Sequence, residues 1–156
     1  MAAARAAIEP DTFHRTLTGA EQQQLQAEAT ILLQPEVVIS LQTRADAASA
    51  LIELHSLESI AVLNDAIRSN RPSQILAVLM ADAERPHPSP DLLPALLTVL
   101  PEAPAETVGP IGVLLARYSA GGTACFETIS TMAMDPDRTL DARLRATEVL
   151  GAFLAH

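Results

Sequence analysis

Apolar residues recur at steps of three and four along most of this chain, which is the spacing of one face of an α-helix. In residues 57–68, for example, Ile60, Leu63 and Ile67 share such a face. The pattern predicts about eight helices in consecutive pairs with short connections. The run EVVIS at residues 36–40 is the one β-like segment, and it lacks a partner strand. The predicted helices cover residues 18–33, a segment around Arg44 up to about 55, and then 57–68, 70–85, 92–100, 106–118, 124–134 and 139 or 141 onward.

Polar residues and prolines mark where these helices begin and end. Thr18 and Glu21 form a capping-box pattern, in which each side chain accepts a hydrogen bond from the other residue's backbone N–H. Pro72 and Pro94 fall in first helical turns, where a missing N–H does little harm. Pro110 should start its helix late or kink it. Further signals are caps at Asn70, Asp91 and Thr123, a helix start at Thr139 or Asp141, and a stop at residues 120–122.

Two stretches far apart in the chain share one skeleton. Residues 43–53, TRADAASALIE, and residues 141–153, DARLRATEVLGAF, both contain Arg, two residues, Ala, two residues, a small or medium apolar residue, then Leu. Their arginines, Arg44 and Arg143, are 99 residues apart, or three periods of 33, and fainter copies begin at Arg71 and Glu106. Small residues three apart lie on one helical face and let a partner helix come close. The pattern therefore predicts a repeated packing unit.

This skeleton resembles the second helix of HEAT-type repeats, a family in which each unit is a pair of helices. The segment ARLRATEVLG fits closely, and the resemblance covers Thr18–His156 as four helix pairs. The family tends to place an Asp six residues before the Arg, as Asp137 stands before Arg143 and Asp65 before Arg71. The resemblance implies that these side chains form hydrogen bonds and ion pairs between repeats.

The fold class that follows is all-α, a short right-handed α-solenoid of about four HEAT-like helix pairs. An irregular helical bundle with the same helices is the alternative, because Ala is common enough in this chain for the match to arise by chance. We expect residues 1–11 to form a flexible leader and residues 12–156 to form a single HEAT-like repeat domain.

The two inner copies differ from the outer ones five and nine residues after the first motif residue. These positions hold Leu76 and Met80 in one inner copy and Ile111 and Leu115 in the other, but mostly polar residues in the outer copies. An exposed apolar stripe across two adjacent helices is a groove for a partner helix or segment. These four residues are therefore the predicted partner-binding site. The alternative is that irregular repeats rotate these helices and bury the stripe.

Composition and charge narrow the classes of partner. The 156 residues carry a net charge of −9, and all 10 basic residues are Arg. Because an acidic chain repels phosphate backbones, we predict no nucleic acid partner but a protein partner with a basic patch. Aromatic residues make up 3%, so the core must consist of Leu, Ala, Ile and Val. At the apolar C-terminal edge, Phe153 and Leu154 either pack inward or stack on another chain, which gives a possible homo-oligomer.

No motif for catalysis or metal binding stands out, so we predict no metal and no cofactor. The four His are scattered, and Cys125, the single cysteine, is predicted to be a small buried hydrophobe. The favoured function is a non-enzymatic interaction module or scaffold. The alternatives are an accessory or self-associating subunit of a larger complex, and a HEAT-like enzyme such as a bilin lyase or DNA glycosylase. Without a signal-peptide core or a long apolar run, we expect a cytoplasmic protein with no membrane contact.

Overall fold

The described part of the chain consists of helices and the short connections between them. This computed structural model describes residues 17–120 and 125–155. Within those ranges it has eight α-helices, two short 3-10 helices and no strand, which confirms the predicted helical class. The predicted leader, the turn at residues 121–122 and the cap at Thr123 lie outside the described residues. The α-helices are α2 (Gly19–Leu33), α3 (Leu41–Leu54), α4 (Leu57–Arg68), α5 (Pro72–Ala83), α6 (Leu93–Val99), α7 (Ala105–Ala120), α8 (Phe126–Met134) and α9 (Leu140–Ala155); the 3-10 helices η2 (Pro90–Leu92) and η3 (Leu100–Glu102) flank α6.

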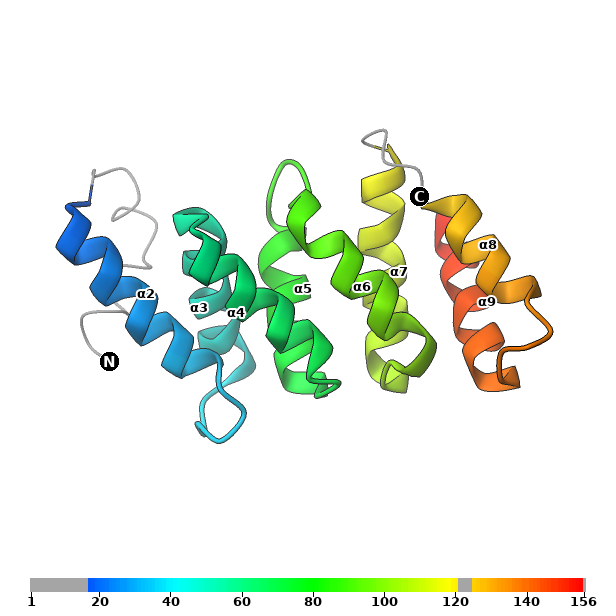
Figure 1. The fold of residues 1–156 in the computed structure, drawn as a ribbon, viewed down its shortest axis with the longest axis horizontal. Coiled ribbons are helices and arrows are strands. Elements are labelled where there is room, and N and C mark those ends of the chain that lie inside the picture. Colours follow the sequence, from blue (N-terminus) through cyan, green and yellow to red (C-terminus); the bar gives the residue numbers. More distant parts are fainter. Residues whose placement is uncertain (1–16, 121–124, 156) are drawn as a thin grey trace.

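The helices lie in two rows (Figure 1). One row contains α2, α4, α6 and α8, and the other contains α3, α5, α7 and α9. Along the second row α3 packs on α5, α5 on α7, and α7 on α9. Between the rows, α2, α4 and α8 each pack on the helix that follows them in the chain. The pairs α2–α3 and α8–α9 therefore stand at opposite ends of the molecule.

Local signals explain most of the helix ends. The capping box at the start of α2 is confirmed, with the N–H of Glu21 donating to Thr18 Oγ1 at 3.2 Å and the N–H of Thr18 donating to Glu21 Oε1 at 3.1 Å. Two predicted caps are wrong. Asn70 has a φ of 58°, a left-handed conformation that Asn tolerates better than most residues, and Arg71 is the cap residue of α5. Asp91 lies inside η2, which starts the helical segment two residues earlier.

The buried positions show how the repeated copies align. In α3 residues 44, 45, 47, 48, 50, 51 and 52 are buried, and six of these seven positions are buried again 30 residues later in α5, at 74, 75, 77, 78, 81 and 82. Gln74 therefore occupies the place of Arg44. The predicted equivalence of Arg71 with Arg44 is wrong, because Arg71 is exposed. Both buried side chains cap the end of α2: Arg44 donates to the carbonyls of Leu32 and Gln34, and Gln74 Nε2 donates to the carbonyl of Leu33 at 2.8 Å.

Arg143 caps the end of α8, the helix before its own, as Arg44 caps the end of α2. Its Nε donates to the carbonyl oxygen of Ala133, in the last turn of α8, at 3.1 Å. The ion pairs expected from Asp65 to Arg71 and from Asp137 to Arg143 do not form in the described part of the chain. The motif Arg thus ties the second helix of a pair to the end of its own first helix, not to the next pair.

Candidate interaction surface

The predicted apolar stripe on the middle helices is not an exposed surface. Ile111 and Leu115 are each 0% exposed, and Leu76 and Met80 are half-buried against the core. The stripe is therefore not exposed, and the alternative expectation, in which these helices bury it, is the one that holds. The positions of the stripe are counted from Arg71 and Glu106 as the first motif residues, whereas the buried pattern of α5 begins at Gln74. The solvent side of α7 carries Val113 instead, which is 39% exposed.

Exposed apolar side chains gather instead on α9, at the end of the second row. Leu140 is 67% exposed, Leu144 56% and Leu154 91%. Thr147 and Gly151, which lie between Leu144 and Leu154 in the helix, are also exposed. These five residues, which we call the α9 outer stripe, follow one another at steps of 4, 3, 4 and 3. They therefore lie along one side of the helix.

The opposite side of α9 is also apolar, and it is already covered. Ala142, Ala146 and Val149 are buried where α9 packs on α7 and α8. A surface helix normally has one apolar face and one polar face, whereas a helix that is apolar on two sides is normally covered on both. The α9 outer stripe is thus a helix face without a partner in the described part of the chain.

A close approach between α7 and α9 fixes which side of α9 faces inward. A Cβ added at Gly112 of α7 would lie 3.2 Å from Cβ of Ala152 and 3.3 Å from Cα of Val149. The helices are therefore nearly in backbone contact, as the small residues of the motif predict. In contrast, nothing lies within 4 Å of a Cβ added at Gly151 on the outer stripe.

The two residues of the apolar C-terminal edge, Phe153 and Leu154, differ in their surroundings. Phe153 packs inward, as one of the two expectations has it, while Leu154 does not. The ring of Phe153 packs edge-on against that of Phe126, with centroids 5.7 Å apart and planes at 76°. Leu154, the next residue, belongs to the outer stripe and points to solvent. Phe153 and Leu154 were predicted from the sequence to form this edge, whereas Leu140 and Leu144 were not. The signal that could have found them is the alternating spacing of four and three from residue 140 to residue 154.

A buried polar network joins α5, the following linker and α7. The carboxylate of Asp82, which is 0% exposed, accepts hydrogen bonds from the Ser89 hydroxyl at 3.0 Å and from the Tyr118 hydroxyl at 3.3 Å. Arg117 donates to the carbonyl of Ala83 at 2.8 Å and to that of Arg85, at the end of α5. Burial, with the negative charge of Asp82 beside it, raises the pKa of Tyr118. The network holds the proline-rich linker in place and presents no free reactive group.

Cys125, the one thiol, is buried as predicted. Its side chain is 0% exposed, and Sγ lies 3.4 Å from the carbonyl oxygen of Leu115. Burial raises the pKa of this thiol, which keeps it protonated near neutral pH. The geometry is that of a small core residue and not of an activated nucleophile.

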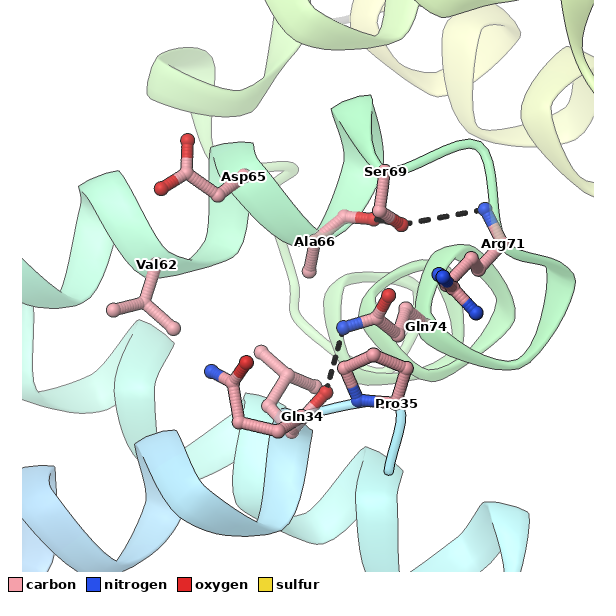
Figure 2. Close-up of a pocket in the computed structure, with 9 residues that line it drawn as sticks. Gln34, Pro35, Val62, Asp65, Ala66, Ser69, Arg71 and Gln74 are labelled. Carbon is pink, nitrogen blue, oxygen red and sulfur yellow. Dashed lines mark hydrogen bonds between the residues drawn. The ribbon is translucent and has the colours of Figure 1, made fainter. Parts of the chain in front are cut away.

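A cavity of about 280 Å³ opens between the ends of α2 and α4 and the start of α5 (Figure 2). Val62 and Ala66 lie on one side and Arg71 and Gln74 on the other. Gln74 Nε2 donates its hydrogen bond to the carbonyl oxygen of Leu33, while Oε1 has no hydrogen-bond partner among the described residues. Less than 1 Å² of this oxygen is exposed, so a ligand in the cavity would not reach it. The cavity is therefore weaker as a candidate site than the α9 outer stripe.

Within residues 17–120 and 125–155, no three His, Cys, Asp or Glu side chains gather in a way that could hold a metal ion. No helix in the same residues is long and apolar enough to cross a membrane. Comparison with protein-family models, curated proteins and solved structures found no match for this chain. A functional proposal therefore rests on the geometry of this chain.

Proposed function

We propose that this chain is a short HEAT-like α-solenoid that acts as a non-enzymatic protein-interaction module, with the α9 outer stripe as its contact surface. Two features support the repeat architecture. The helices alternate between two rows, and Arg44 and Arg143 cap the first helices of the outer pairs in the same way. The inner copies depart from the family's pattern, since Gln74 replaces the motif Arg in α5. The proposal therefore rests on the arrangement more than on the motif.

The observation that carries the proposal is a helix face that is buried in α3 and exposed in α9. Counted from the motif arginines, Leu144, Thr147 and Gly151 correspond to Ala45, Ala48 and Ile52. The three α3 residues are at most 4% exposed, because α3 has neighbours on both sides in the structure. The equivalent face of α9 has the residue types of a helix–helix contact, but none of the described helices lies on it. A partner that supplies an amphipathic helix would cover this face.

Other parts of the proposal come from composition. A net charge of −9 favours a partner with a basic patch around an apolar anchor. The cytoplasm remains the expected location, because a single Cys cannot form an internal disulfide.

The test is native purification with crosslinking and mass spectrometry, comparing the natural chain with Leu144→Asp. Crosslinks from a recovered protein, or from a second copy, should map to residues 140–154. Leu144→Asp should remove them, since a charge would enter an apolar contact. Val113→Asp, at an exposed apolar residue of α7, is the matched control and should leave them intact. Recovery of the same crosslinks from Leu144→Asp would rule out this surface.

A further inference from the structure

We infer that the partner of the α9 outer stripe is a second copy of this chain, with the two α9 helices packed side by side and parallel. This inference rests on the proposed function, since it names the occupant of the same surface. A second copy replaces the partner with a basic patch, because Arg143 beside the stripe supplies the local positive charge. The place of α9 in the fold permits the arrangement. Figure 1 shows α8 and α9 at one end of the two rows, so a two-fold axis parallel to α9 leaves the bodies of the two copies on opposite sides.

The spacing of the stripe is that of a two-stranded coiled coil. Its alternating steps of four and three place Leu144 and Gly151 at one core position of the heptad, and Leu140, Thr147 and Leu154 at the other. Identical core residues of two parallel helices meet in layers, so each leucine would pack on its counterpart. Gly151 would leave room for the helices to come closer in one layer.

Charge complementarity selects the second copy and its direction. Arg143 lies beside one edge of the stripe and Glu148, five residues later, beside the other. In a parallel pair these flanking positions face each other across the interface, so Arg143 of each copy meets Glu148 of the other. In an antiparallel pair the same edges meet, and like charges would be opposed. Arg143 is available for this contact because only its Nε is engaged with Ala133.

The size of the stripe predicts a weak dimer. Stable interfaces take about 800 Å² from each partner, and one side of a helix with three leucines falls short of that area. We expect a dissociation constant of roughly 10–500 μM. Two electrostatic effects on the dimer depend on salt. At low salt, repulsion between two chains of net charge −9 weakens association, and at high salt, screening weakens the Arg143–Glu148 pairs.

The first test is sedimentation equilibrium of the purified full chain from about 5 μM to 1 mM, a range that brackets the expected affinity. The natural chain should pass from monomer to dimer. Leu144→Asp should stay monomeric with unchanged helix content, because Leu144 is exposed in the single chain. Glu148→Arg should weaken the dimer roughly 2- to 20-fold, as expected for two exposed ion pairs. Val113→Asp and Glu106→Arg, at exposed sites on α7, are the matched controls and should not change it.

The second test determines the direction of the two helices. In a parallel pair, Leu140→Cys brings the two new thiols together, and mild oxidation should give a disulfide-linked dimer. In an antiparallel pair, residue 140 lies opposite residue 154, about 21 Å along the helix from its counterpart. Only a mixture of Leu140→Cys and Leu154→Cys chains would then crosslink. The natural Cys125 is buried and does not interfere.

Each outcome decides the inference. Concentration-dependent dimers that Leu144→Asp abolishes, together with Leu140→Cys crosslinking, support it. A natural chain that stays monomeric at the highest concentration overturns it, and so do dimers that crosslink only in the mixture. If the purified chain is monomeric but a different protein crosslinks to residues 140–154 after native purification, the proposed function stands and the second copy is wrong.

Discussion

Replacing Gly112 by Ala tests how closely α7 and α9 approach each other. The added Cβ would lie 3.2 Å from Cβ of Ala152 and 3.3 Å from Cα of Val149, both closer than ordinary van der Waals contact. Because one of these atoms is backbone, the helices themselves must move apart slightly. Overpacking of this kind costs about 1–3 kcal/mol, while the better helix propensity of Ala contributes about 1 kcal/mol of stability. We expect Gly112→Ala to destabilise the fold by about 1 kcal/mol.

Gly151→Ala is the matched control on the facing helix. It makes the same chemical change inside a helix, but nothing lies within 4 Å of the new Cβ. Only the propensity gain remains, so this variant should be about 1 kcal/mol more stable than the natural chain. Since the propensity terms cancel, the difference between the two variants measures the strain at the α7–α9 contact. It should be about 2 kcal/mol, or roughly 4–8 °C in Tm.

Thermal and urea unfolding followed by far-ultraviolet circular dichroism is the assay, at about 0.5 μM protein, well below the expected dissociation constant, so that self-association contributes little. The order of stability should be Gly151→Ala, then the natural chain, then Gly112→Ala. A Gly112→Ala chain as stable as Gly151→Ala would show that α7 and α9 do not approach as closely as the geometry requires. The inward side of α9 would then need to be reassigned, and the α9 outer stripe with it.

Three further predictions test the core. Ile111→Asp places an unpaired charge in the core and should cost more than about 4 kcal/mol, whereas Val113→Asp should cost less than about 1 kcal/mol in the same urea titration. Arg44→Met leaves the carbonyls at the end of α2 without donors and should cost about 3 kcal/mol. The exposed Arg71→Met should cost less than about 0.5 kcal/mol, and equal losses would contradict the alignment based on Gln74. Tyr118 is the single tyrosine, and burial raises its pKa, so the unfolded chain loses this proton first and stability should fall as pH rises above about 10. Tyrosinate absorbance should then rise together with the loss of helicity; an earlier rise would show that Tyr118 is accessible.

The helices and the composition of the core could be predicted from the sequence, because both depend on neighbouring turns. The positions 60, 63 and 67 predicted one helical face, and Leu63 and Ile67 are indeed buried. Thr18 and Glu21 lie three residues apart, so their capping box needs no distant contact. The wrong cap at Asn70 has a different cause. A single Asn suits both a helix cap and a left-handed turn, and only the direction of the chain beyond it decides between them.

The alignment of the repeats could not be predicted from residue identity. Arg44 and Gln74 differ in charge and length, but both donate to consecutive carbonyls at the end of α2. A search for the next Arg therefore selects Arg71, three residues too early. The predicted surface positions are counted five and nine residues after the motif residue, so this shift of three residues makes them wrong in α5. Counted from Gln74 they are Leu79 and Ala83, and counted from Arg71 they are Leu76 and Met80. Burial, which depends on three-dimensional neighbours, is what identifies the equivalent residue.

The size and spacing of the side chains in the α9 outer stripe indicate what kind of helix could cover it. At the equivalent places α3 has Ala45 and Ala48, which are buried in a tightly packed row. α9 has Leu144 and Thr147 there, and larger side chains keep two helices farther apart, toward the 8–10 Å typical of helix pairs. The equivalent residue of α5 is Ile75, which is buried, so the row also accommodates a large side chain at this place. What distinguishes α9 is the heptad spacing of its exposed side chains: a helix with the same spacing places leucine against leucine, and a second copy of α9 has this spacing along its whole length.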